Sequence, residues 1–260
     1  MRALVVTNMD PTAEQPSLGE FVRDQVEALR RLDADVEVFA FEPGSPGAYA
    51  RAAAALRRRP AHYDIVHAHF GLTAWPALAA RGRRRVVTLH GNDVTNPRSR
   101  AITRAALPRY DLVAAVSEEL AGRAPTKDDV SVLPCGVDTH RFRAIHRTEG
   151  RARLGLEHDR PYLLFPADPA RPEKRYDLAQ AAAGETPLLA LKGLEPVKVP
   201  LWVNAANAVL VPSDREGFGL TVLEALACEV PVLASPVGIA PKVLQGIDGA
   251  YCGPFVAAEW

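Results

Sequence analysis

Two glutamates, Glu216 and Glu224, lie on either side of a short glycine-rich turn at residues 217–219. The turn follows a predicted strand that ends at Pro212 and precedes a helix predicted to begin near Leu220. The first turn of a helix offers unpaired N–H groups and the positive end of the helix dipole, which suit a phosphate. Carboxylates beside it could accept hydrogen bonds from sugar or ribose hydroxyls. Alternatively, both acids are exposed charges at a helix start, where acids are favoured in any case.

A basic segment, Arg-Pro-Glu-Lys-Arg at residues 171–175, follows another predicted strand and precedes a helix. Several cations at the end of a strand could neutralise a diphosphate. The alternative interpretation is a solvated basic turn without a ligand.

Histidines follow two successive predicted strands in the first half of the chain. His67 and His69 lie in one such segment, and His90 begins the segment His-Gly-Asn-Asp at residues 90–93. These loops could form a polar edge that binds a sugar, or the histidines could be hydrogen-bonded structure. A metal site is disfavoured because further ligands at suitable spacing are missing. The segment Pro-Ser-Leu-Gly at residues 16–19, after the first strand, could be a phosphate loop, although it has one glycine and lacks the dinucleotide spacing G-x-G-x-x-G.

Short apolar runs alternate with helical segments along the chain, and the pattern restarts after residue 155. Apolar strands separated by helices are typical of parallel α/β sheets, which bind ligands at the carboxyl ends of their strands. Residues 136–155 are polar and weakly periodic, so we expect two domains, 1–145 and 146–260, whose facing sides would form a cleft. The predicted strands are residues 3–6, 36–39, 65–67, 86–89, 112–114 and 130–133, and then 162–165, 188–191, 208–211 and 232–234.

The bulk composition of the 260-residue chain is that of an ordinary globular protein, with 48% hydrophobic residues. Lys plus Arg and Asp plus Glu both number 31, so nothing global points to nucleic acid. Three widely spaced cysteines favour a reduced, cytoplasmic protein. No segment has the roughly 18 apolar residues that a membrane span needs. Arginine clusters at residues 57–59 and 83–85 are either solvated helix ends or contacts for anionic lipid or a phosphorylated acceptor.

Several blocks of the sequence occur in the order typical of glycosyltransferase family 4, and the chain resembles this family nearly end to end. The most specific block is residues 212–227, Pro-Ser-Asp-Arg-Glu-Gly-Phe-Gly-Leu-Thr-Val-Leu-Glu-Ala-Leu-Ala, followed by residues 230–238. The other matching blocks are residues 64–71, 87–93, 111–117, 133–138 and 171–174.

The resemblance implies roles for particular residues. Glu216 matches the glutamate near the transferred sugar, Lys174 the lysine on the donor diphosphate, and His90 the histidine beside the reacting sugar. We predict these three as catalytic. Glu224 matches the glutamate on the donor ribose. Substrate binding is also expected at residues of the matching loops: Gly19, His69, Asn92, Asp93, Ser117, Arg171, Arg175, Gly217, Phe218, Gly219 and Leu220.

Four features depart from the family pattern. Asp168-Pro169 replaces the usual Gly-Arg pair, so Arg171 would have to substitute for that arginine. Leu18-Gly19 carries one glycine where the family often has two, and Glu229 stands where a glycine is usual. Only the short segment 183–199 connects the basic segment to the glutamate motif. The sequence also ends at Trp260, soon after that motif. We therefore expect a second domain that is incomplete relative to the family.

The resemblance implies a GT-B fold, with two facing Rossmann-like parallel-sheet domains and a cleft between them. It implies a retaining glycosyltransferase of hexosyltransferase type that uses a UDP- or GDP-sugar, with no metal or other cofactor. The expected partners are this donor, an acceptor (lipid-linked, polysaccharide or small molecule) and the inner face of the membrane as a peripheral contact, but no nucleic acid. The alternative is a glycosyltransferase-like protein that binds its ligand without catalysis. Another nucleotide-sugar enzyme of the same fold and a nicotinamide dehydrogenase are less favoured.

Overall fold

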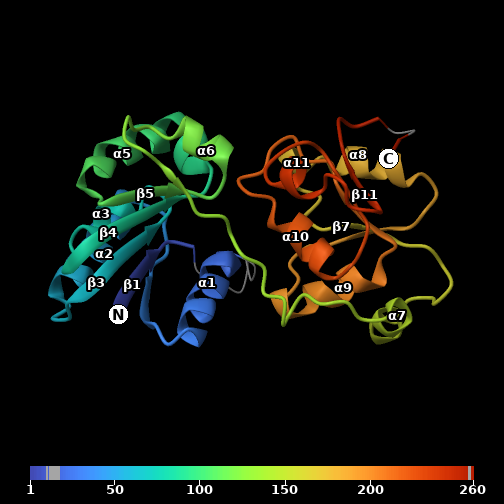
Figure 1. Ribbon diagram of the computed structural model, residues 1–260, viewed down its shortest axis with the longest axis horizontal. Helices are drawn as coiled ribbons and strands as arrows, with labels where there is room; N and C mark the ends of the chain where they lie inside the picture. The colour runs from blue at the N-terminus through green and yellow to red at the C-terminus, as the bar shows by residue number, and fades with distance from the viewer. Residues whose placement is uncertain (10, 12–17, 257–258) are drawn as a thin grey trace. The chain divides into compact units, whose positions relative to one another are not determined.

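The computed structural model describes residues 1–9, 11, 18–256 and 259–260, which form two compact units. The first unit runs to Gly136 and the second from Val137 to Trp260, coloured blue to green and yellow-green to red in Figure 1. Each unit contains one parallel sheet with helices, which confirms the expected pair of parallel-sheet α/β domains. The units divide earlier in the chain than the expected boundary between 145 and 146, because Phe142 is buried in the core of the second unit.

The first unit has a six-stranded parallel sheet with the strand order β2-β1-β3-β4-β5-β6. The longest helix described, α2, has 13 residues, and none in the described part of the chain has the length and apolar character needed to cross a membrane. The elements are β1 (Arg2–Thr7), α1 (Glu20–Arg31), β2 (Asp35–Ala40), α2 (Pro46–Arg58), β3 (Tyr63–His69), α3 (Ala74–Ala77), β4 (Gly82–Leu89), α4 (Asn92–Thr95), α5 (Pro97–Ala106), the 3-10 helix η1 (Leu107–Arg109), β5 (Leu112–Ala115), α6 (Glu118–Arg123) and β6 (Ser131–Val132).

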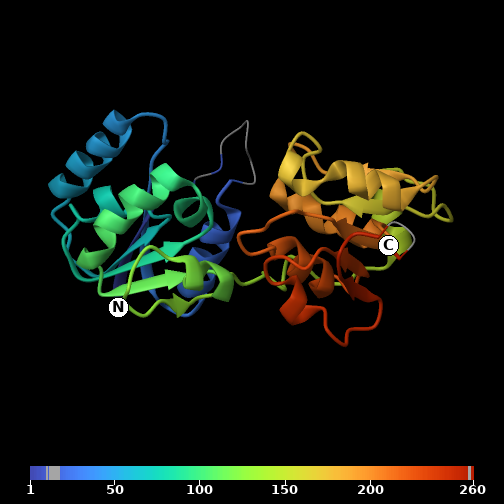
Figure 2. The same cartoon turned by 90° about the horizontal axis from the view of Figure 1, so that it is seen from above.

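Strand β1 shows why this sheet is covered on both faces. Its alternate residues Ala3 and Val5 pack against Val22 and Val26 of α1. The residues between them, such as Leu4, point to the opposite face and are fully buried as well. Because all the strands are parallel, their carboxyl ends share one edge, and the loops that follow β3 and β4 therefore start side by side. The helices around the strands can be followed in Figure 2.

The second unit has a five-stranded parallel sheet with the order β11-β10-β9-β7-β8, which agrees with the expected incomplete second domain. Helix α7 lies inside the polar segment 136–155, where the domain boundary was expected, and strand β11 was not predicted. The elements are α7 (Arg147–Leu154), β7 (Leu163–Phe165), η2 (Pro172–Lys174), α8 (Tyr176–Ala183), β8 (Leu188–Ala190), η3 (Pro196–Lys198), α9 (Val199–Ala205), β9 (Ala208–Val211), α10 (Leu220–Ala227), β10 (Val232–Ala234), α11 (Ala240–Val243) and β11 (Ala250–Cys252).

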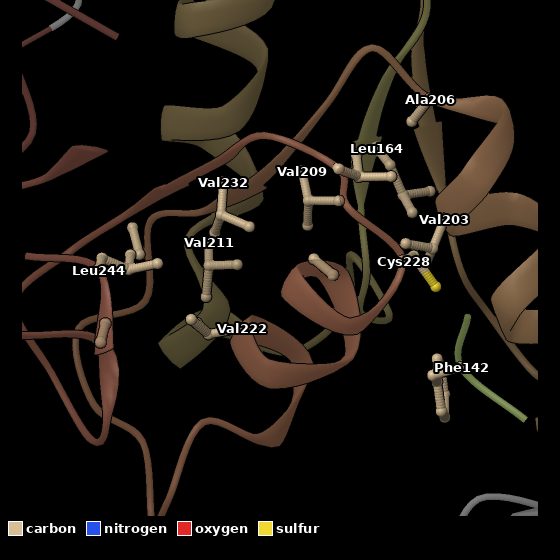
Figure 3. Close-up of a cluster of buried hydrophobic side chains, with 14 residues drawn as sticks. Phe142, Leu164, Val203, Ala206, Val209, Val211, Val222, Cys228, Val232 and Leu244 are labelled. Carbon is tan, nitrogen blue, oxygen red and sulfur yellow. The ribbon is translucent and has the colours of Figure 1, made fainter. Parts of the chain in front are cut away.

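The core of the second unit lies between the central strands and helices α9 and α10. Val211 of β9 and Val232 of β10 are buried in one cluster with Val222 of α10, as Figure 3 shows. Val222 is 1% exposed, and burial of a side chain of this size stabilises the fold by about 1.5–3 kcal/mol. This packing fixes α10 against the carboxyl ends of the strands, so the turn that precedes the helix is held in place.

Glu229 occupies a position in the turn after α10 that suits glycine. Its φ is 56°, and Val230 and Glu229 donate backbone hydrogen bonds to Ala225 and Leu226, the pattern of a glycine-terminated helix. A side chain with a Cβ in this conformation destabilises the folded state by about 1–2 kcal/mol. Glycine removes this strain, but its greater conformational freedom in the unfolded chain offsets part of the stabilisation. We expect Glu229→Gly to stabilise the protein by about 0.5–1 kcal/mol, measured by calorimetry. Glu229→Ala should bring no such gain, and an equal gain from alanine would contradict the strain.

Candidate functional site

Lys174 and Glu216 form a largely buried ion pair in the second unit. The Lys174 Nζ donates to both carboxylate oxygens of Glu216, at 2.6 and 2.8 Å, and the two side chains are only 14% and 12% exposed. Ser213 donates its hydroxyl to the same carboxylate at 2.8 Å. The two predicted catalytic residues of this unit are therefore in direct contact. Ser213 was not predicted as a site residue, although its place directly after the end of a buried strand was a signal.

The sheet explains why these residues meet. Lys174 lies in the loop after β7, and Glu216 lies in the loop after β9, the neighbouring strand in the sheet. The backbone N–H of Asp214 donates to the carbonyl of Glu173 at 3.0 Å and ties the two loops together. A cation and a carboxylate far apart in sequence are thus held at one edge of a parallel sheet, where such folds bind ligands.

The glycine turn carries the backbone from Glu216 into α10. Gly219 has a φ of 89° and precedes the first helical residue, Leu220. Phe218 is 7% exposed, so its side chain belongs to the interior, and its backbone carbonyl accepts a hydrogen bond from the Ile239 N–H at 2.7 Å. Gly238 packs directly behind the turn: a Cβ added there would lie 2.4 Å from the Phe218 carbonyl oxygen and 2.9 Å from the Glu216 Cβ. Gly238 lay in a matching block but was not predicted as a site residue.

The arginines of the basic segment point to acidic neighbours. Arg171 donates to the carboxylate of Glu173 at 2.7 Å, and this contact holds the pKa of Glu173 below its ordinary value. Arg175 pairs with Asp177 and Asp214. The structure thus does not place Arg171 in the ion pair with Glu216, so its substitution for the missing family arginine stays a prediction.

Glu224 lies one turn into α10 and is half-buried. Burial of the Cys228 thiol raises its pKa to about 11, and the charge of Glu224 adds to this shift. The donor-ribose role of Glu224 remains a prediction.

In the first unit, the two histidine loops meet as expected. His69 at the end of β3 lies beside His90 after β4, with Nδ1 of His69 3.1 Å from Nε2 of His90. Burial lowers the pKa of His90 to about 3 and that of His67 to about 4, and the pKa of His69 is lowered well below its ordinary value. All three rings are therefore neutral near pH 7. No group of three or more His, Cys, Asp or Glu among the described residues is arranged to hold a metal ion.

Asp93 is buried between the two histidine loops. Its side chain is fully buried, and its carboxylate accepts backbone hydrogen bonds from Gly71 at 3.0 Å, Gly91 at 2.7 Å and His90 at 3.1 Å. Burial raises the pKa of this carboxyl above its ordinary value, although the hydrogen bonds from these backbone donors act to lower it. The carboxylate of Asp93 therefore holds the loops after β3 and β4 together. Substrate binding by Asp93 stays a prediction, and Asn92 beside it is exposed.

Two other predicted residues of the first unit, Ser117 and Gly19, are the N-cap residues of helices α6 and α1. Ser117 accepts a hydrogen bond from the Leu120 N–H at 3.3 Å and caps α6. Gly19 begins α1 with a φ of 70°, and an added Cβ would lie 1.9 Å from the Met9 carbonyl oxygen. Only glycine fits this position. Pro16 and Ser17 of the predicted loop lie outside the described residues.

Family models match both units of this chain. Residues 41–141 match the model described as Glycosyltransferase Family 4, and residues 151–256 match the one described as Glycosyl transferases group 1. The chain belongs to glycosyltransferase family 4. The D-inositol 3-phosphate glycosyltransferase of Geodermatophilus obscurus is 31% identical to this family 4 chain over an alignment 256 residues long, gaps included, which covers 74% of the chain and 56% of that protein. The chain thus spans little more than half the length of this relative.

Two further comparisons bear on the length and the fold of this family 4 chain. The D-inositol 3-phosphate glycosyltransferase of Mycolicibacterium paratuberculosis is 27% identical over 309 residues, covering 96% of this chain and 68% of that protein. Because the match is longer than the 260-residue chain, that relative carries segments that this chain lacks. The structure of Anabaena Alr3699/HepE in complex with UDP-glucose has the same fold, with a TM-score of 0.73 and 18% identity, covering 100% of this chain and 87% of that one.

Proposed function

We propose that this chain is a retaining glycosyltransferase that moves a sugar from a nucleoside-diphosphate donor to a hydroxyl acceptor. The observation that carries the proposal is the Lys174–Glu216 pair, held beside the glycine turn and the start of α10. It combines a cation for a diphosphate, a carboxylate for sugar hydroxyls and a helix N-terminus for phosphate oxygens. Family membership supports the reaction and the retention of configuration.

The barrier to this reaction lies in breaking the bond between the sugar and the diphosphate, because negative charge develops on the leaving phosphate. The ammonium of Lys174 has three N–H donors. Among the described residues, Glu216 accepts two of them, which leaves the third to donate to a phosphate oxygen of the sugar donor. The backbone N–H groups after Gly219 add fixed positive ends of dipoles. Such preorganised groups stabilise the developing charge without reorganisation. Glu216 would orient the sugar.

The donor can be identified by a thermal-shift screen of UDP-, GDP- and ADP-sugars. UDP-glucose is the first candidate, because the structurally similar HepE was solved in complex with it. A donor at 100 times its Kd should stabilise the folded protein by about 2.7 kcal/mol and raise Tm accordingly. No shift with any nucleotide sugar would count against the proposed donor site.

The acceptor is proposed to carry a hydroxyl and, in the first instance, a phosphate. The relatives from Geodermatophilus obscurus and Mycolicibacterium paratuberculosis are named for D-inositol 3-phosphate, so this is the first acceptor to test, beside lipid-linked sugars and polysaccharide. We place the protein in the cytoplasm, with contact to the inner face of the membrane through exposed arginines such as Arg57, Arg58 and Arg83. Co-sedimentation with anionic vesicles tests this contact.

Chelation of divalent metals is expected to leave sugar transfer unchanged. Lys174 and the helix N-terminus supply the positive charge that a metal would otherwise bring to the leaving diphosphate. The measurement is the initial rate of transfer with and without excess EDTA, with added Mg²⁺ as the control. A fall of about tenfold or more on chelation, reversed by Mg²⁺, would contradict a metal-independent mechanism.

A second candidate is a protein that binds the donor without transferring its sugar. It is favoured by the segments that this chain lacks beside its Mycolicibacterium relative. Donor binding in the thermal-shift screen without transfer to any tested acceptor would support this second candidate.

A further inference from the structure

Four rings form a continuous stack in the first unit. The ring centroids of Phe21 and His90 are 4.7 Å apart, those of His90 and His69 5.3 Å, and those of His69 and His67 4.1 Å. His67 ends the stack with a 2.8 Å contact from Nε2 to the hydroxyl of Thr88. The stack fixes the plane of each ring, so the ring nitrogens have defined neighbours.

A single proton lies between His69 and His90. Nδ1 of His69 and Nε2 of His90 are 3.1 Å apart, a hydrogen-bond distance. Both imidazoles are neutral near pH 7 because burial lowers their pKa values. In a neutral pair, one of the two facing nitrogens carries the hydrogen and the other accepts it, so the tautomer of one ring sets the tautomer of the other.

The surroundings of His69 decide which nitrogen carries this hydrogen. His69 is 1% exposed, and its other nitrogen, Nε2, is buried with no hydrogen-bond partner among the described residues. A buried N–H without an acceptor is a rarer and costlier arrangement than a buried lone pair without a donor. His69 therefore keeps its hydrogen on Nδ1 and donates it to Nε2 of His90. The hydrogen of His90 must then sit on Nδ1.

We propose that His69 is a positioning residue that holds His90 in the Nδ1–H tautomer, so that His90 presents a hydrogen-bond donor to an acceptor oxygen of the sugar. Asp93 supports the same arrangement, because its carboxylate fixes the backbone of His90 and Gly91. The ligand of His90 rests on the proposed function, whereas the tautomer is a property of the free protein. The two can therefore be tested separately.

The tautomer is measured by ¹⁵N-detected NMR of the free protein, with the His90 signals assigned from a His90→Asn variant. The proposal predicts a protonated Nδ1 and a bare Nε2 for His90. His69→Asn keeps an amide donor near the position of Nδ1 and should preserve this pattern. His69→Leu removes the donor, and His90 should then lose this protonation pattern. If the leucine variant does not fold, His69→Gln is measured in its place. A proton on Nε2 of His90 in the wild type, or an unchanged pattern in the leucine variant, would overturn the proposal.

Transfer kinetics give the second readout. His69→Leu should lower kcat about 10- to 100-fold, as loss of a residue that orients a ligand-contacting histidine typically does. The KM of the donor should change less than about threefold, and His69→Asn should restore most of kcat. His67→Asn, in the same stack but without contact to the shared proton, is the matched control and should stay within about threefold of wild type. Equal losses for the His67 and His69 variants would indicate a general packing effect and overturn the positioning role. If the wild type transfers no sugar, the proposed function fails while the NMR measurement still decides the tautomer.

Discussion

Replacement of Lys174 by alanine is expected to lower kcat about 100- to 1000-fold and to weaken donor binding. The change removes the ammonium that contacts Glu216 at 2.6 Å and that we propose meets the leaving diphosphate. Loss of one preorganised charge-stabilising group typically has an effect of this size. It also leaves the largely buried carboxylate of Glu216 without its cation, which adds a cost in stability. Initial rates and the thermal shift with the donor measure the two effects.

The control for this variant is Lys198→Ala. Lys198 is 58% exposed and pairs with Glu195 at the surface of the same unit, so its loss should change neither kcat nor donor binding appreciably. Lys174→Ala that folds and still transfers sugar at the wild-type rate would show that the ion pair is structural. The donor site would then have to lie elsewhere.

Gly238→Ala is expected to destabilise the second unit by about 2–4 kcal/mol and to reduce sugar transfer at least 100-fold. The added Cβ would meet the Phe218 carbonyl at 2.4 Å, and a φ of 61° adds strain for any residue with a side chain. Relief of the clash requires the turn that carries Glu216 and the segment of Gly238 to move apart, and we expect the turn to be displaced. Displacing a positioned group by about 1 Å can cost about 100-fold in rate. Calorimetry and initial rates measure the two effects.

A matched control separates backbone strain from displacement of the site. Gly246 has a φ of 73°, but nothing lies within 4 Å of its added Cβ. Gly246→Ala should therefore cost only the strain, about 1–2 kcal/mol, and leave kcat unchanged. Similar losses of activity in the two alanine variants would mean that Gly238 is not a support of the site.

The architecture could be predicted from the sequence because its strands are apolar on both faces. Residues 3–6 and 208–211 are buried strands of the two sheets. Helix α7 was missed because it is rich in arginine, and Arg151 is buried through contacts that only the tertiary fold supplies: it donates to the carbonyls of Ala205 and His158. Strand β11 is only three residues long, which is too short for a periodic signal.

The candidate site could be predicted only in part. Residue types and family blocks pointed to Lys174, Glu216 and His90, whereas their contacts depend on strand order. Ser213 had a signal only in its place after a buried strand, because its role is a single hydrogen bond. The role of Gly238 comes from its lack of a Cβ beside the turn, a contact that depends on the tertiary fold. The backbone hydrogen bonds that the buried carboxylate of Asp93 accepts could not be predicted either, because burial and backbone donors are not visible in the sequence.

The central claim is tested most directly by NMR of the purified chain with the nucleotide sugar that gives the largest thermal shift and the proposed acceptors. The account predicts that free nucleoside diphosphate appears together with a new glycoside whose anomeric configuration matches that of the donor. It also predicts that both signals appear at least about 100-fold more slowly with Lys174→Ala. A bound donor that is never consumed, or a product with inverted configuration, would contradict the account.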